Sequence, residues 1–256
     1  MTQPDTARYD DGFYADQVDG SARAAAVVLP LVMGHLAVER VIDVGCGQGA
    51  WLAAAESLGA RALTGLDGPW VDRAKLRSAR IAFHPTDLAR PLPDHGRHDL
   101  AISVEVAEHL PAARADGFVA DLCRAADVVL FSAAVPQQGG TEHVNEERAS
   151  RWIARFAAEG YDCFDLVRGA VWDDARVAWW YRQNLFVFVS RRSPLHERFA
   201  GAPLPPAPHD LVHPEAFEAK VGWLEGERQR LQRWTDHPTL GQALRVLWRA
   251  LTGGRR

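Results

Sequence analysis

Three side chains able to bind a metal or move a proton stand close together after an apolar run. Residues 99–104 lead directly into Glu105-Val106-Ala107-Glu108-His109, so Glu105, Glu108 and His109 occupy positions i, i+3 and i+4. If this segment is helical, the three side chains share one face. Two carboxylates and an imidazole on one face can bind a hard divalent cation such as Mg²⁺ or Mn²⁺, or supply a general base.

A fourth group of this kind comes later, where His143 follows two glycines in Gly139-Gly140-Thr141-Glu142-His143. The predicted metal ligands are Glu105, Glu108, His109 and His143. The alternative is a metal-free site in which these groups position backbone and substrate, with His109 or His143 as the base.

A glycine-rich turn follows the apolar run of residues 41–44. Gly45, Gly47 and Gly49 alternate with other residues and lead into a helix-like stretch at 50–58. Alternating glycines let the chain turn tightly, so that backbone N–H groups approach a ligand at a helix N-terminus. This spacing also satisfies the dinucleotide-binding pattern, with Asp67 at the distance of a ribose-binding carboxylate.

Asp43 distinguishes between these ligands. Its carboxylate, two residues before Gly45, would repel a pyrophosphate but attract the cationic methionyl part of S-adenosylmethionine. Asp43 therefore favours S-adenosylmethionine. Asp67 ends the next predicted strand, where a carboxylate can accept hydrogen bonds from both ribose hydroxyls, and Gly68 continues the turn beside the adenosine. An ordinary Asp-Gly surface turn is the structural alternative.

These segments together resemble the class I S-adenosylmethionine-dependent methyltransferases, particularly those of bacterial glycan and glycosylated natural-product pathways. The resemblance covers residues 40–190 and rests on the glycine turn, Gly65-Leu66-Asp67-Gly68, Glu105-Val106-Ala107-Glu108-His109-Leu110, His143-Val144-Asn145-Glu146 and Trp180-Tyr181-Arg182-Gln183-Asn184. It implies that the cofactor contacts are Asp43, Gly45, Gly47, Gly49, Asp67, Gly68, Asp87 and Leu88. Asp87 would accept from the adenine amine, although a helix N-cap explains it equally well.

The resemblance implies transfer of a methyl group to a hydroxyl of a sugar or glycosylated small molecule. A hydroxyl has a high pKa and must lose its proton during transfer, so a metal or the catalytic set His109, His143 and Glu105 would assist. Transfer to nitrogen or carbon would leave such a set without a purpose. The four predicted ligands also look like the metal site of small-RNA 2′-O-methyltransferases and of some ubiquinone-pathway O-methyltransferases.

Two other functions remain open. The first is a small-RNA or ubiquinone-type O-methyltransferase, which would need a basic groove or an apolar pocket. A formal net charge of -4 and a pI near 6.2 argue against a general nucleic-acid surface. The second is a catalytically idle, cofactor-binding scaffold subunit of a glycan-assembly complex.

The order of apolar runs predicts the elements that position these residues. Strands are expected near 40–44, 62–66, 80–84, 98–104, 127–132, 161–167 and 184–189, and helices at 21–33, 50–58, 69–78, 112–126 and 148–159. This alternation predicts an α/β fold with a doubly wound, Rossmann-like, mostly parallel sheet of seven strands. The last two strands lack a long intervening helix and are expected to pair antiparallel.

The segment between these two strands concentrates aromatic residues. Trp172, Trp179, Trp180 and Tyr181 alternate with Asp, Arg, Gln and Asn side chains. Flat aromatic faces with polar neighbours suit a sugar ring, whereas packing in the core is the commoner use of such residues. Both interpretations remain open.

A chain of 256 residues suits one catalytic domain with an appendage. We expect a methyltransferase domain over 1–193, a proline-rich linker over 194–214 and a helical C-terminal extension over 215–256, containing a short helix at 215–234. Residues 237–256 contain arginines but no acidic residue, and their leucines and Trp248 share one helical face. That segment is expected to dock on the protein or a second subunit, or to lie on a membrane surface.

Cysteine spacing and the N-terminus bear on the compartment. Cys46, Cys123 and Cys163 are widely separated, which indicates neither a zinc site nor a disulfide framework. No signal-like or bilayer-spanning run is present. We therefore expect a cytoplasmic protein, with peripheral membrane contact through 237–256 as one alternative.

Overall fold

The computed structural model describes residues 11–200, 210–236 and 239–251. The chain divides into two compact units, Met1–Leu211 and Val212–Arg256.

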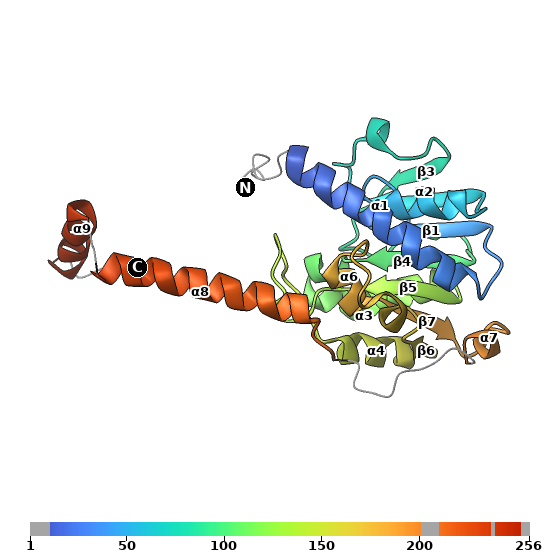
Figure 1. The fold of residues 1–256 in the computed structure, drawn as a ribbon. Coiled ribbons are helices and arrows are strands. Elements are labelled where there is room, and N and C mark those ends of the chain that lie inside the picture. The colour runs from blue at the N-terminus through green and yellow to red at the C-terminus, as the bar shows by residue number, and fades with distance from the viewer. Residues whose placement is uncertain (1–10, 201–209, 237–238, 252–256) are drawn as a thin grey trace. The chain divides into compact units, whose positions relative to one another are not determined.

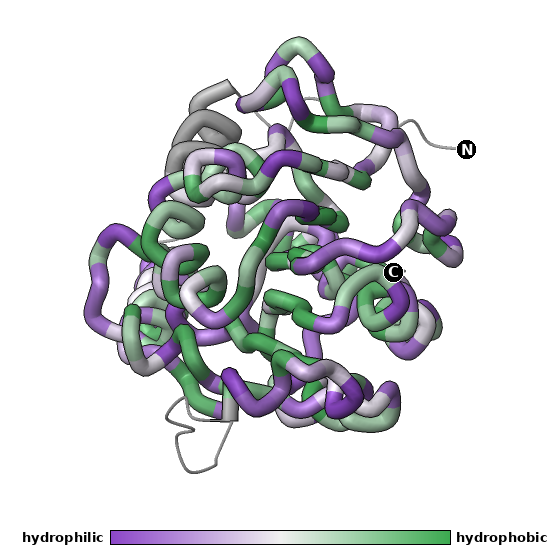
Figure 2. Tube along the Cα trace, turned by 90° about the vertical axis from the view of Figure 1, so that its right-hand side faces the viewer, coloured by the Kyte–Doolittle hydropathy of each residue, from purple (hydrophilic) through white to green (hydrophobic). Residues whose placement is uncertain are grey.

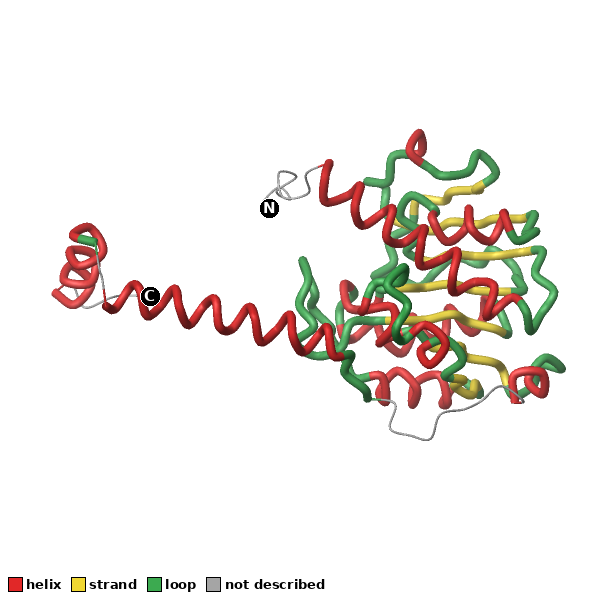
Figure 3. Tube along the Cα trace, in the orientation of Figure 1, coloured by secondary structure: helices red, strands yellow, loops and turns green. Residues whose placement is uncertain are grey.

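The first unit is built on a sheet of seven strands (Figures 1 and 3). They are β1 (Arg40–Val44), β2 (Ala62–Asp67), β3 (Ile81–Pro85), β4 (Leu100–Val104), β5 (Val128–Ser132), β6 (Tyr161–Phe164) and β7 (Phe186–Ser190). Their order is β3-β2-β1-β4-β5-β7-β6, and only β7 runs antiparallel to its neighbours. The predicted mostly parallel sheet and the antiparallel final pair are both confirmed.

Helices cover both faces of this sheet (Figure 1). They are α1 (Asp11–Met33), α2 (Ala50–Ser57), α3 (Ala115–Ala125), α4 (Ala149–Ala158), α5 (Arg168–Val171), α6 (Trp179–Asn184) and α7 (His196–Ala200). Leu100 and Ile102 of β4 belong to the core cluster shared with α1 and α2, while Ala101 between them belongs to the cluster shared with α3 and α4. Successive residues of a strand point to opposite faces, so β4 is buried on both sides.

Figure 2 shows hydrophobic and hydrophilic stretches alternating along the chain. The strand order reverses beside β1, and the C-terminal ends of β1 and β4 lie there next to each other. In open α/β sheets this is the place where ligands bind.

The prediction of a helix at 69–78 is wrong. The structure has only a single 3₁₀ turn there, η2 (Arg73–Lys75), whose first residues are held by the Asp72 side chain accepting from the Ala74 N–H at 2.9 Å. Residues 69–80 are exposed or half-buried. Without a buried apolar face, packing cannot support a longer helix.

The second unit contains two helices, α8 (Pro214–Asp236) and α9 (Leu240–Leu251). The short helix predicted at 215–234 is instead one helix of 23 residues. Its sequence is rich in Glu, Ala, Leu, Gln and Arg, and no proline follows Pro214 within it. The predicted linker contains α7, and its residues 201–209 lie outside the described residues.

Among the described helices, none combines the length and the apolarity needed to cross a membrane.

Candidate active site

The glycine turn after β1 needs glycine for two separate reasons. Gly45, Gly47 and Gly49 have φ angles of +88°, +50° and +77°, in the region that side chains disfavour. A Cβ on Gly45 would also lie 2.3 Å from a methyl group of Val106, which follows β4. The turn therefore packs directly against the segment that carries the predicted catalytic residues.

Asp67, at the end of β2, holds the turn in place. Its Oδ2 accepts a hydrogen bond from the Gly47 N–H at 2.7 Å, and its Oδ1 accepts one from the Gly68 N–H at 2.6 Å. Each carboxylate oxygen can accept a second hydrogen bond. The predicted ribose contact is therefore compatible with the part that Asp67 plays in the turn.

Asp43 is buried below the turn, at 2% exposure, and its Oδ2 has no hydrogen-bond partner within the described residues. Burial raises its pKa well above 3.8, and the nearby charge of Asp67 raises it further. A buried carboxylate of this kind is stabilised by a cation beside it. S-adenosylmethionine carries that positive charge, so the residues present fit this cofactor.

Asp87 and Leu88 follow β3. The Asp87 side chain is exposed, accepts a hydrogen bond from the Ala89 N–H at 3.0 Å and pairs with Arg90 at 3.2 Å. It thus caps a turn and not a helix, because no helix lies among the described residues between β3 and β4. Leu88 packs against the core cluster that includes α3. The predicted contacts of Asp87 and Leu88 with adenine remain predictions.

The helix expected from Glu105 to His109 does not form. Glu105 has a left-handed φ of 55°, and its N–H donates to both the carbonyl oxygen and the hydroxyl of Ser132 at 3.1 Å. Only a 3₁₀ turn, η3 (Ala107–His109), follows. The turn at Glu105 reverses the chain after β4, so Glu105 does not share a helical face with Glu108 and His109.

Glu105 is instead surrounded by neutral amides. Its Oε2 accepts from Gln138 Nε2 at 3.0 Å, and its Oε1 accepts from Asn184 Nδ2 at 3.2 Å. Asn184 also donates to Gln138 Oε1 at 2.8 Å and accepts from Gln183 Nε2 at 3.0 Å. Burial raises the pKa of Glu105 above its usual value, and these hydrogen bonds offset part of that rise. We call Glu105, Gln138, Gln183 and Asn184 the amide bracket.

The other three predicted ligands do come together. One ligand atom each from Glu108, His109 and His143 lies within 4.8 Å of the others. We call these residues the Glu-His-His cluster. The rings of His109 and His143 are 4.8 Å apart, centroid to centroid, and nearly perpendicular.

Glu108 is the unusual member of the cluster. It is fully buried, and neither carboxylate oxygen has a hydrogen-bond partner of normal geometry within the described residues. Burial raises its pKa well above 4.5, and the adjacent Glu105 carboxylate raises it further. A fully buried carboxyl beside a second carboxyl holds a proton or binds a cation.

The two histidines differ in their surroundings. Burial lowers the pKa of His109, and His143 lowers it further, which favours the neutral imidazole that can bind a metal or accept a proton. His143 Nδ1 lies 3.0 Å from Glu146 Oε1. That carboxylate orients the ring and leaves Nε2 for other contacts.

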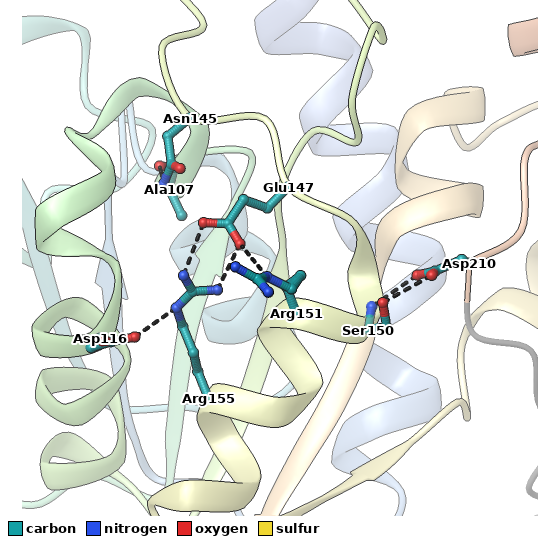
Figure 4. Close-up of polar contacts among 8 residues, drawn as sticks. All are labelled: Ala107, Asp116, Asn145, Glu147, Ser150, Arg151, Arg155 and Asp210. Carbon is teal, nitrogen blue, oxygen red and sulfur yellow. Dashed lines mark hydrogen bonds and ion pairs between the residues drawn. The ribbon is translucent and has the colours of Figure 1, made fainter.

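Backbone contacts bring His143 to Glu108. The Glu108 carbonyl accepts from the N–H groups of Val144 and Asn145 at 2.9 and 3.0 Å. Asn145 Nδ2 also donates to the Ala107 carbonyl at 3.4 Å (Figure 4). The loop after β5 is thereby attached to η3, although His143 comes 34 positions after His109 in the sequence.

An ion-pair network anchors the far end of this loop (Figure 4). Glu147 accepts from Arg155 Nη1 and Nη2 at 2.8 and 2.9 Å, and Arg155 Nε donates to Asp116 of α3 at 2.7 Å. Arg151 reaches the same Glu147 carboxylate at 3.6 Å. Bidentate arginine pairs of this kind fix geometry as well as charge.

The aromatic residues of the segment before β7 differ in their burial. Tyr181 is buried, with its hydroxyl 3.0 Å from Ser21 Oγ of α1 and its ring edge-on to Trp51. Burial raises its pKa to about 12. Trp179 and Trp180 are half-buried, with ring centroids 5.6 Å apart, and keep part of their faces open.

Sequence reasoning missed three contributors to this site: Gln138, Val106 and the Glu147–Arg155 pair. Gln138 and Val106 carry no recognisable signal, because their importance depends on residues distant in the sequence. The i, i+8 spacing of Glu147 and Arg155 is likewise not a usual helical pairing.

The sheet order and the glycine turn with its buried carboxylate define a class I methyltransferase fold. A sequence model of the methyltransferase domain family matches residues 14–164, more than half of the chain. The chain belongs to this family. No curated protein is similar enough in sequence to match it.

Solved structures with this fold include three from bacteria. An O-methyltransferase family protein from Burkholderia thailandensis has 14% identity and a TM-score of 0.55, over 72% of this chain and 60% of that one. An amino pentose methyltransferase from Micromonospora echinaspora, involved in calicheamicin biosynthesis, has 17% identity and a TM-score of 0.51, over 73% of this chain and 99% of that one. The S-adenosylmethionine-bound magnesium protoporphyrin IX methyltransferase of Synechocystis has 18% identity and a TM-score of 0.51, over 72% of this chain and 86% of that one. At these identities the likeness concerns the fold alone.

Proposed function

We propose that this S-adenosylmethionine-dependent methyltransferase methylates a hydroxyl group of a sugar or glycosylated small molecule. The observation that carries this proposal is the Glu-His-His cluster. Its Glu108 and His109 follow β4 just after Val106, which packs against Gly45 of the cofactor turn, and its His143 comes from the loop after β5. A hydroxyl acceptor must lose a proton that it holds tightly, and the cluster supplies groups suited to that task.

The cluster also suits a divalent cation such as Mg²⁺ or Mn²⁺. Glu108, His109 and His143 would hold it, because one ligand atom of each lies within 4.8 Å of the others and the Glu105 carboxylate adds negative charge beside Glu108. Oxygen and imidazole ligands suit these ions. When bound, the ion would lower the pKa of an acceptor hydroxyl and orient it.

Glu105 is a further participant of the proposed site rather than one of the three grouped ligands. The amide bracket holds its carboxylate in one orientation next to Glu108. From there it can accept a hydrogen bond from the acceptor or add to the negative charge around a cation. His109 or His143 is the proposed base in the absence of metal.

The half-buried Trp179 and Trp180 and the amides near Asn184 support a sugar as acceptor. Aromatic faces pack against the C–H groups of a sugar ring, and amides bond its hydroxyls. The amino pentose methyltransferase of calicheamicin biosynthesis shares the fold, which agrees with a sugar acceptor here. The formal net charge of -4 does not suit an RNA acceptor.

The test is formation of S-adenosylhomocysteine with a panel of nucleotide sugars and glycosides, followed by mass spectrometry of the product. We expect an O-methyl product. Turnover should be at least tenfold slower for wild type in EDTA and for Glu108→Gln, and the turnover of EDTA-treated wild type should recover when Mn²⁺ is restored. Glu159→Gln, an exposed site, is the matched control. Full turnover in EDTA would exclude the metal, and an N-methyl or C-methyl product would refute the hydroxyl acceptor.

A further inference from the structure

Helix α9 of the second unit carries a continuous apolar face. Within the described part of the chain, Leu240, Leu244, Leu247, Trp248 and Leu251 of α9 are between 58% and 79% exposed, and no α9 residue is buried. At 100° per residue these five side chains fall on one side of the helix, with Trp248 at its edge.

The opposite side of α9 is basic. It carries Arg245 and Arg249, and the sequence continues with Arg255 and Arg256 at the end of the chain. Residues 237–256 contain no Asp or Glu, so this segment has a formal charge of +4 from its four arginines. Its positive charge contrasts with the net charge of -4 of the whole chain.

This charge selects among the surfaces that could cover the apolar face. A second copy of α9 would bring another all-basic helix to the first, and the two would repel. An anionic bilayer offers opposite charge at the headgroups and an apolar phase directly below them. Trp248, on the border between the two sides, suits the interfacial layer.

We propose that α9 binds in the plane of an anionic lipid surface. The leucines enter the upper acyl region, the indole lies at the headgroup level, and Arg245 and Arg249 contact lipid phosphates. A helix of 12 residues without a transmembrane-length apolar run lies on a bilayer and does not span it.

The neighbouring helix α8 is an internal comparison. It also exposes large apolar residues, among them Leu224 and Leu231 at 53% and 59%. However, acidic and basic side chains alternate along it, as in Glu225, Glu227, Arg228 and Arg230. Exposed apolar residues occur on both helices, and only α9 combines them with a single sign of charge.

The experiment is co-flotation of the full chain with vesicles of phosphatidylcholine alone or of phosphatidylcholine and phosphatidylglycerol at about 7:3. We expect binding to the anionic vesicles, weakened by salt, and at least tenfold lower affinity for R245E/R249E. The control R228E/R230E changes the total charge equally, but on α8, and should retain affinity within about twofold.

A second pair of variants tests the apolar face. L247D on α9 should lose vesicle binding, whereas L231D on α8 should keep it. S-adenosylmethionine affinity and far-UV circular dichroism verify that each variant is folded. Vesicle binding needs no methyl acceptor, so this experiment can succeed or fail independently of the proposed reaction.

Four outcomes would overturn the proposal. The first is no flotation with anionic vesicles at low salt, and the second is equal flotation of R245E/R249E and wild type. The third is a dimer that L247D dissociates, with no vesicle binding by either protein. The fourth is a lower melting temperature of L247D than of wild type in the absence of lipid. The third outcome would assign the apolar face to a second copy. The fourth would assign it to the protein itself.

Discussion

Asn184, at the end of α6, donates a hydrogen bond of 3.2 Å to the carboxylate of Glu105, although 79 positions separate them in the sequence. Glu105 leaves β4 in a left-handed conformation, and Asn184 lies two residues before the first residue of β7. Because β5 lies between β4 and β7 in the sheet, this contact passes over its end. The two residues connect the parallel and antiparallel parts of the sheet at the candidate active site.

Removal of this contact should be costly. In Asn184→Ala, the half-buried Glu105 and Gln138 and the buried Gln183 each lose a partner, so the free energy of unfolding should fall by about 1–3 kcal/mol. Urea unfolding at pH 7 measures this change. Gln137→Ala, at an exposed neighbouring position, should change stability by less than about 0.5 kcal/mol. Equal stability of both variants would contradict the structural importance of the amide bracket.

Two glycines of the cofactor turn should differ in their tolerance of alanine. Gly45→Ala places a methyl group 2.3 Å from Val106, whereas a Cβ on Gly47 meets nothing within 4 Å. Both have positive φ, so both changes carry backbone strain. We expect Gly45→Ala to lower the melting temperature and S-adenosylmethionine affinity more than Gly47→Ala. Val106→Ala should partly rescue Gly45→Ala, and no rescue would show that the close packing is unimportant.

The ribose and adenine assignments can be separated by calorimetry. Asp67→Ala removes two hydrogen bonds to the turn and the predicted ribose contact, so S-adenosylmethionine should bind at least tenfold more weakly. Asp87→Ala removes an exposed turn cap and should cost less than about threefold in affinity if that cap is its main role. Unchanged affinity of Asp67→Ala would refute the ribose assignment. A large loss with Asp87→Ala would establish the adenine contact.

Asp43 should make stability and cofactor binding depend on pH in opposite directions. Its pKa is raised above 3.8 in the folded protein, so the folded state binds more protons than the unfolded state. The contribution of Asp43 to stability is therefore present below about pH 3.8 and is lost as the pH rises through its folded pKa. Without cofactor, the melting temperature of wild type should fall relative to Asp43→Asn as the pH increases from 5 to about 7.5.

The cofactor reverses this dependence, because its positive charge favours the ionised carboxylate. S-adenosylmethionine affinity of wild type should rise with pH over the same range, and that of Asp43→Asn should be weaker and flatter. Isothermal titration calorimetry at several pH values measures both. A wild type and an Asp43→Asn variant with parallel pH profiles would show that Asp43 does not titrate there.

The strands and the cofactor turn could be predicted from local sequence alone. Runs of apolar residues mark β1, β4 and β5, and glycines at 45, 47 and 49 mark a backbone that must adopt positive φ. The negative charge of Asp43, two residues before the turn, favoured the cationic methyl donor over a dinucleotide. These features depend on neighbours within a few residues.

The arrangement around the acceptor could not be predicted in this way. The spacing of Glu105, Glu108 and His109 predicted one helical face, but the left-handed Glu105 ends the strand in a turn toward Ser132. Hydrogen bonds to a residue 27 positions away decided that conformation. Helical spacing cannot reveal such a contact.

The sequence by itself determined the α/β architecture, the cofactor turn and the residue types able to assist methyl transfer. Only the tertiary structure decided that Glu108, His109 and His143 form one cluster while Glu105 belongs to the amide bracket. The physical reason is the distance along the sequence over which each kind of interaction acts. Periodicity and glycine preference act over a few residues, whereas the cluster depends on the β4–β5 pairing and on the backbone bonds from Val144 and Asn145 to Glu108.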